Sequence, residues 1–111
     1  MTSKDDLAAI IDKAGSAPEV LKELSSWSKT FQFEVSDEDP YFVTIEKGKI
    51  SLEDGKSPSP AATINASGMV LSELFAGKLN AIQAFMGGQL KVSGDIVSAQ
   101  KLTSIINKAR E

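Results

Sequence analysis

Cysteine and histidine are both absent from this 111-residue sequence. Without cysteine there is neither a disulfide nor a thiolate metal site. Without histidine the chain lacks the commonest general base, the commonest metal ligand and the imidazole of the serine and cysteine triads. An enzyme of this sequence would have to use carboxylates, lysines or hydroxyls alone. We therefore predict a non-catalytic protein with no metal and no cofactor.

The sequence also has little positive charge and no long apolar run. Its net charge of −3 argues against a nucleic-acid partner, because phosphate binding requires a basic surface. No stretch approaches the ~20 apolar residues of a membrane span. Asp5 and Asp6 follow Lys4 at once, so the N-terminus does not resemble a signal peptide. We expect a cytoplasmic protein.

The charges that are present are unevenly distributed along the chain. Residues 1–55 contain 6 lysines and 12 acidic residues, whereas residues 56–111 contain 6 basic and 3 acidic residues. One interpretation is a chance distribution over solvated helix faces. The other is a mildly basic side that meets anionic head groups or carboxylates, and the sequence leaves both open.

Length and periodicity predict one α+β domain spanning residues 1–111. Helical patterns begin at Ser3 and Ser16, each with an acidic residue at the capping-box position, and the second helix carries Trp27. Alternating patterns over residues 31–36, 41–46, 50–52 and 62–65 predict strands, with a hairpin at residues 47–48. Two short helices capped by Ser67 and Asn80, a strand at residues 90–93 and a last helix after Asp95 follow.

Grouped strands flanked by helices predict a single five-stranded, mostly antiparallel sheet with the helices packed on one face. Polar residues alternate with apolar ones in the strands, which is typical of a sheet whose other face is solvated. These polar residues are Gln32, Glu34, Thr44 and Lys91.

The short helices carry more bulky apolar side chains than they need to shield themselves. They are Leu71, Leu74, Phe75, Leu79, Ile82, Phe85 and Met86. Such stripes usually fill a core. The alternative is that several of them line a cavity that takes an apolar ligand.

An ordered series of short motifs carries a family resemblance. The stretch Gly77-Lys78-Leu79-Asn80, then Ala84-Phe85-Met86, Gly88-Gln89-Leu90-Lys91-Val92 and Gly94-Asp95 resembles the signature of the sterol carrier protein lipid-binding domain family. Pro60-Ala61-Ala62-Thr63-Ile64 upstream, and Ala99, Lys101 and Leu102 downstream, extend the resemblance over roughly residues 30 to 110. Ala81 stands where family members often carry proline, and Gln89 where lysine is usual.

The resemblance implies a lipid carrier with an apolar tunnel between the helices and the sheet, which binds a fatty acid, a fatty acyl-CoA or a similar lipid. Phe85 and Met86 are the best single candidates, since methionine adapts to varied ligand shapes. The last helix would act as a wall or lid. The full set of expected ligand-binding residues is Leu71, Leu74, Phe75, Leu79, Ile82, Phe85, Met86, Leu102, Ile105 and Ile106.

Polar residues supply further candidates, each with a simpler structural role. Gln83, Asn65 and Ser67 could contact a ligand at the tunnel mouth, or serve as strand surface and helix caps. Lys78, Lys91 or Lys101 could attract an acidic head group, or lie on a solvated surface. Residues 37–39 are acidic but lack the ligand spacing of a calcium loop, so we predict a solvated turn there.

Two other functions compete with the carrier. A structural or protein-interaction domain of the same fold would fill its cavity with Phe75, Phe85 and Met86. An enzyme would use Asp95 with Lys91 or Lys101, but Asp95 is already explained as a helix cap. The sequence leaves open whether the chain contacts membranes transiently, forms a homodimer or serves a protein partner.

Overall fold

The computed structural model describes residues 2–15 and 17–110. Its α+β class and its five strands confirm the predicted fold class. In chain order the elements are α1 (Ser3–Ala14), α2 (Pro18–Leu24), β1 (Lys29–Val35), β2 (Tyr41–Glu46), β3 (Lys49–Asp54), β4 (Ala62–Ala66), α3 (Gly68–Phe75), α4 (Ala81–Met86), β5 (Lys91–Gly94) and α5 (Ile96–Arg110).

The five strands form one mixed sheet in the order β3-β2-β1-β4-β5. Neighbours pair antiparallel except for β1 and β4, which run parallel, so the prediction of a mostly antiparallel sheet is confirmed. Lys47 and Gly48 join β2 to β3 with φ angles of 50° and 81°. Two consecutive positive φ angles are the geometry of the two-residue hairpin turn that suits the sheet's twist.

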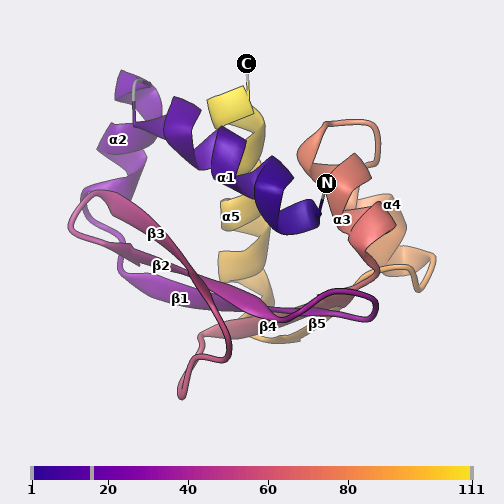
Figure 1. Ribbon diagram of the computed structural model, residues 1–111. Helices are drawn as coiled ribbons and strands as arrows, with labels where there is room; N and C mark the ends of the chain where they lie inside the picture. Colours follow the sequence, from indigo (N-terminus) through magenta and orange to yellow (C-terminus); the bar gives the residue numbers. More distant parts are fainter. Residues whose placement is uncertain (1, 16, 111) are drawn as a thin grey trace.

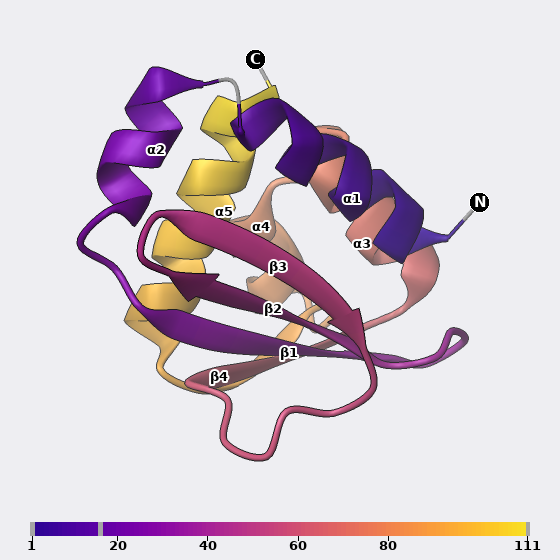
Figure 2. The same ribbon diagram turned by 60° about the vertical axis from the view of Figure 1, so that its left-hand side comes forward.

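All five helices lie on the same side of the sheet (Figures 1 and 2). Helix α1 packs against α3 and α5, and α5 also contacts α2, β4 and β5. The helices α3 and α4 lie over the β4–β5 end of the sheet in Figure 1, away from α2. The helical layer therefore has two ends, and the β5 end carries α3 and α4.

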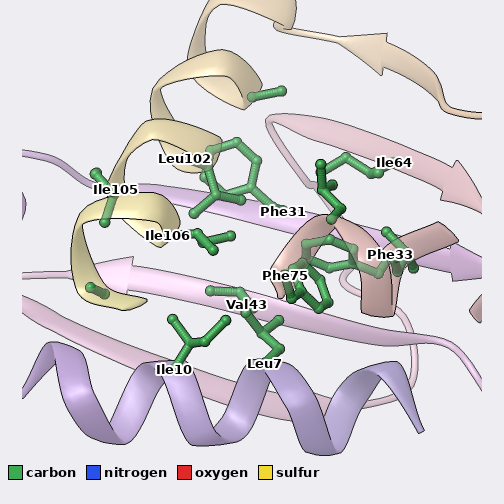
Figure 3. Close-up of a cluster of buried hydrophobic side chains, with 14 of the residues drawn as sticks. Leu7, Ile10, Phe31, Phe33, Val43, Ile64, Phe75, Leu102, Ile105 and Ile106 are labelled. Carbon is green, nitrogen blue, oxygen red and sulfur yellow. The ribbon is translucent and has the colours of Figure 1, made fainter. Parts of the chain in front are cut away.

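Strand register places the large apolar residues on the face that the helices cover. Phe31 is opposite Val43 and Ala62, and Phe33 is opposite Tyr41 and Ile64. In Figure 3 this face meets Leu7 and Ile10 of α1 and the apolar side chains of α5. Full burial of one such side chain stabilises the fold by about 1.5–3 kcal/mol.

The other face of the sheet is less solvated than predicted, because a loop covers part of it. Gln32 is buried, and its Nε2 donates to the carbonyl oxygens of Tyr41 and Gly55, each at 3.1 Å. Its Oε1 accepts from the backbone N–H of Ser57 at 2.7 Å. The prediction of a solvated Gln32 was wrong because the loop after β3 folds back beneath the sheet.

The starts of the first two helices differ from the predicted ones by one residue, whereas Ser67 and Asn80 cap α3 and α4 as predicted. The capping box of α1 consists of Thr2 and Asp5 rather than Ser3 and Asp6, and it is complete in both directions. Ala17 is the N-cap of α2 and makes no side-chain cap, while Ser16 lies outside the described residues. Helix α2 ends at Leu24, so Trp27 follows this helix instead of belonging to it.

Candidate functional site

A cavity of about 650 Å³ lies between the β4–β5 end of the sheet and the helices α3, α4 and α5. Its walls come from the end of α3 with the connection to α4, α4 itself, the Leu90–Val92 region and one side of α5, and its floor comes from β1 and β4. The apolar lining residues are Phe33, Ile64, Leu74, Phe75, Leu79, Ala81, Ile82, Phe85, Leu90, Val92, Ile96, Ala99, Leu102 and Ile106.

The inner wall is built from the sheet and from α3. Phe33 and Ile64 are paired across β1 and β4, and Phe75 of α3 packs edge-on against Phe33 with ring centroids 6.0 Å apart. Leu102 and Ile106 of α5 line the same cavity and lie near these side chains in Figure 3. This wall offers a ligand dispersion contacts and desolvation, with no charged group.

Helix α4 forms the outer wall, and a side-chain cap stabilises its N-terminus. The Asn80 side chain accepts from the backbone N–H groups of Ile82 and Gln83, at 2.8 and 3.2 Å. Ala84 turns inward and is buried, whereas Ile82 and Phe85 line the cavity while remaining partly exposed. The cavity therefore reaches the surface beside α4.

Helix α5 forms the remaining wall and is anchored at its start by Asp95. This carboxylate accepts from the Ser98 hydroxyl at 2.6 Å and from the Ser98 backbone N–H at 3.0 Å. These hydrogen bonds, with a smaller contribution from Lys29, hold the pKa of Asp95 below its usual range. Asp95 is thus occupied as a helix cap, the role that its position in the sequence predicts.

One flank of α5 adds polar groups to the cavity. Gln100, Thr103, Ser104 and Asn107 line it, spaced as i, i+3, i+4 and i+7. They lie beside the apolar stripe of this helix, which consists of Ile96, Ala99, Leu102, Ile105, Ile106 and Ala109. The apolar stripe and this flank are adjacent on the helix surface, so a cavity beside the helix touches both.

Seven of the ten expected ligand-binding residues line the cavity, and three do not. Those that line it are Leu74, Phe75, Leu79, Ile82, Phe85, Leu102 and Ile106. Leu71 and Ile105 are almost fully buried in the core that α1 covers. Met86 lies outside the cavity and is 80% exposed.

Several lining residues carry no local signal that sequence reasoning could have used. Phe33, Ile64 and Val92 read as ordinary inward-facing strand residues, and only the pairing of β1, β4 and β5 brings them to one cavity. Ile96 is different, because it begins the apolar stripe of α5 three residues before Ala99, and that spacing could have singled it out.

Of the polar candidates, too, some line the cavity and others do not. Gln83 and Lys78 line the cavity, whereas Asn65, Lys91 and Lys101 do not. Ser67 acts as the cap of α3, accepting from the Val70 backbone N–H at 3.2 Å. In the described part of the chain, no group of three or more Asp and Glu side chains could hold a metal ion.

The space is not filled in the way that the interaction-domain alternative requires. Phe75 packs against Phe33 at one wall, Phe85 lies at the rim, and Met86 points away from the cavity. These three side chains therefore leave a volume in the range of small-molecule sites, roughly 300–1,000 Å³.

The chain matches the model of the SCP-2 sterol transfer family over residues 7–107. It is 32% identical over 82 residues to hydroxysteroid dehydrogenase-like protein 2 from Xenopus tropicalis. That match covers 70% of this chain and 19% of the relative, so the chain spans about a fifth of the relative's length.

Several solved structures are similar in fold, and two of them show the range. Palmitated SCP2L2 from Aedes aegypti has a TM-score of 0.75 at 19% identity, covering 96% of this chain and 95% of that one. The sec-alkylsulfatase Pisa1 from Pseudomonas sp. has a TM-score of 0.68 at 20% identity, covering 78% of this chain and 14% of that one. At these identities the likeness shows a shared fold. None of the helices in the described residues is long and apolar enough to cross a membrane.

Proposed function

The chain belongs to the SCP-2 sterol transfer family, and from this we propose that it carries the acyl chain of a fatty acid, a fatty acyl-CoA or a similar lipid in the cavity beside α4. Lipid binding and transfer is the function of the family. The proposal adds a ligand class, a place for it and a mechanism of desolvation without chemical change. The cytoplasmic location stays a prediction from the sequence.

The observation that carries the proposal is the cavity itself, with walls that are mostly hydrocarbon. An acyl chain gains about 0.8 kcal/mol for each methylene that leaves water, less the cost of ordering the chain. Such a ligand requires no specific polar contact for its tail. The seven expected residues that line the cavity, with Phe33 and Ile64 beneath them, would supply the tail contacts.

The polar groups at the cavity suit a small polar head group. Lys78 is the only charged residue among the described lining residues, and the amides of Asn80 and Gln83 follow it along the chain. A carboxylate or thioester end near this edge would find hydrogen-bond donors while the tail lies against the inner wall. The Aedes aegypti protein of similar fold is palmitated, which makes palmitoyl and oleoyl chains the first ligands to test.

The lining also supports a carrier role over catalysis by carboxylates. A general acid or base must lie within hydrogen-bond reach of the reacting group. Neither Asp nor Glu is among the described residues that line the cavity, and Asp95 is committed to Ser98. The dehydrogenase-like name of the Xenopus tropicalis relative does not extend to this chain, which matches about a fifth of it.

Native mass spectrometry of gently purified protein tests the proposal directly. We expect a bound fatty acid or acyl-CoA that is released on denaturation, or uptake of added oleate or palmitoyl-CoA by the lipid-free protein. Solvent extraction and lipid analysis then identify the ligand. A protein that contains no lipid and takes up neither probe contradicts the carrier function.

A pair of variants locates the ligand. Phe85→Asp places a charge at the cavity rim, so we expect it to abolish acyl-chain uptake while lowering stability little. Leu21→Asp is a matched control, because Leu21 is 38% exposed, close to the 43% of Phe85, and lies outside the cavity. If Phe85→Asp lost its folded structure to the same degree as its acyl-chain uptake, Phe85 would be an ordinary core residue.

A further inference from the structure

Helix α4 presents an apolar face to solvent. Ile82, Phe85 and Met86 are spaced as i, i+3 and i+4, and the side chains of Ile82 and Met86 are 61% and 80% exposed. Residues at this spacing lie on one helix face. The inward contact of the helix is made by Ala84, so this six-residue helix buries its small residue and exposes its large ones.

The exposed face is continuous with the mouth of the cavity. Ile82 and Phe85 line the cavity and belong to the exposed face at the same time. Ile96, at the start of α5, also lines the cavity and is exposed, and the adjacent Val97 is more exposed still. Apolar exposure of this kind beside polar residues is typical of an interaction site.

The segment that carries this face is basic, with Glu73 and Asp95 just outside its two ends. Lys78 lies at the cavity edge immediately before α4. Residues 74–94, which include α4 and both its connections, contain two lysines and no acidic residue. Helix α1 is mildly acidic instead, with three aspartates and two lysines. The α4 end of the molecule is therefore the better of the two for an anionic partner.

We propose that the α4 face, formed by Ile82, Phe85 and Met86 and bordered by Lys78, docks on the surface of an anionic lipid bilayer. Interfacial helices bury large apolar residues about 5–10 Å deep, while basic residues remain at the head groups. Docking in this way would point the cavity mouth into the acyl chains. The proposal rests on the proposed function, because a lipid carrier must take up and release its ligand at a membrane.

The same observations disfavour a second copy of the chain as the partner. A two-fold dimer through this face would pair the patch with itself. Each copy would then bring its own Lys78 to the border of one interface. A bilayer containing anionic lipid supplies both the apolar depth and the compensating charge.

Vesicle binding by the full chain tests the docking face. We would measure co-sedimentation with phosphatidylcholine vesicles that contain or lack phosphatidylserine, and expect binding only when phosphatidylserine is present. Met86→Gln should weaken that binding on the order of tenfold, because one large side chain no longer leaves water. Met69→Gln is the matched control, since Met69 is 72% exposed on α3 and lies outside the cavity.

A second pair of variants tests how much charge contributes to vesicle binding. Lys78→Gln should weaken binding about fivefold at low salt, and the loss should shrink as salt is added. Lys49→Gln changes the net charge equally, but Lys49 is on β3 at the opposite edge of the sheet. Equal effects of the two variants would overturn the proposal of a specific docking face.

Failure of the docking proposal is distinguishable from failure of the carrier function. Met86 does not line the cavity, so Met86→Gln should take up soluble palmitoyl-CoA as the unchanged protein does. Unaltered vesicle binding by Met86→Gln would overturn the docking face and leave the carrier function intact. A dimer in sedimentation equilibrium that dissociates in Met86→Gln would also overturn it, by assigning the face to a second copy.

Discussion

The carboxylate of Glu38 accepts hydrogen bonds from both the backbone N–H and the hydroxyl of Ser3, at 3.0 and 2.9 Å. Its neighbour Asp37 accepts from the backbone N–H of Gly68 at 2.8 Å. Two adjacent acids in the β1–β2 turn therefore hold the first residues of α1 and α3. The acidic turn was predicted to be solvated, and the structure shows instead that it connects two helices to the sheet.

The first prediction concerns Gly68, which is pressed against this turn. A Cβ atom on Gly68 would overlap Glu38 Oε2 and come within 2.9 Å of its Cδ. Glu38 could move only by giving up its bonds to Ser3. We expect Gly68→Ala to lower the free energy of unfolding by about 1–3 kcal/mol in urea denaturation.

The control for this variant is Gly15→Ala. A Cβ at Gly15 would be 3.5 Å from the Asp12 carbonyl oxygen, an ordinary contact, and the φ of Gly15 is −63°. The Gly15→Ala substitution should leave the free energy of unfolding unchanged or raise it by about 0.5–1 kcal/mol. A Gly68→Ala protein as stable as Gly15→Ala would mean that Glu38 is not fixed in place.

The second prediction concerns alkaline pH. Tyr41 is buried, its hydroxyl lies 2.8 Å from Ser3 Oγ, and desolvation raises the pKa of its phenol above the usual range, although the Ser3 bond opposes the shift. The native state therefore holds this proton more tightly than the unfolded state does. Stability from neutral Tyr41 is complete below the unfolded pKa of about 10 and falls as pH rises toward the folded value.

Because Tyr41 is the only tyrosine, ultraviolet titration reports on it alone. We expect phenolate to appear together with unfolding and not before it. Tyr41→Phe should remove this part of the alkaline loss of stability. Ionisation of Tyr41 near pH 10 in a protein that is still folded would contradict the burial of its hydroxyl.

The third prediction concerns acid. The pKa of Asp95 is lowered by its bonds to Ser98, and the pKa of Asp5 is lowered by its bonds to Thr2. Each carboxylate therefore contributes stability above its unfolded pKa of about 4, and that contribution is lost as pH falls through the lower folded value. Urea denaturation across this range should show Asp95→Asn removing part of the acid dependence, and Asp95→Asn with Asp5→Asn removing more.

The fourth prediction uses the single tryptophan. Trp27 does not line the cavity; its ring packs 5.5 Å from Phe31, and Lys101 Nζ lies 4.6 Å from its centroid. We expect saturating oleate to change Trp27 emission little, and Lys101→Ala to change it more. An oleate effect as large as that of Lys101→Ala would show that α5 shifts when the ligand binds.

Periodicity predicted the features that depend on neighbours along the chain. The spacing of Leu79, Ile82 and Phe85 and the cap at Asn80 suffice to predict an amphipathic turn of helix, and all four residues line the cavity. Met86 has the same spacing yet lies outside, because the periodicity of a helix does not tell which flank meets solvent. Phe31 and Phe33 alternate with the polar Gln32 and Glu34, and this alternation likewise predicted the inward face of the strand.

Features that join distant segments could not be predicted. Ser3 and Glu38 are far apart in the chain, and nothing local marks Ser3 as the partner of a turn residue instead of a cap. Gln32 alternates like a solvated residue, but its burial depends on a loop that begins over twenty residues later. The parallel pairing of β1 with β4 also joins distant segments, and it brings Phe33 to the cavity.

The parallel pairing of β1 with β4 also separates the part of the chain that builds most of the sheet from the part that builds the cavity walls. The strands β1, β2 and β3 form a meander from consecutive sequence, whereas the cavity walls come almost wholly from residues 74–107, with Phe33 and Ile64 as the floor. One contiguous third of the chain, which includes the edge strand β5, therefore supplies nearly all of the cavity lining. Substitutions within this third would change the shape of the cavity and leave the meander of β1, β2 and β3 unchanged.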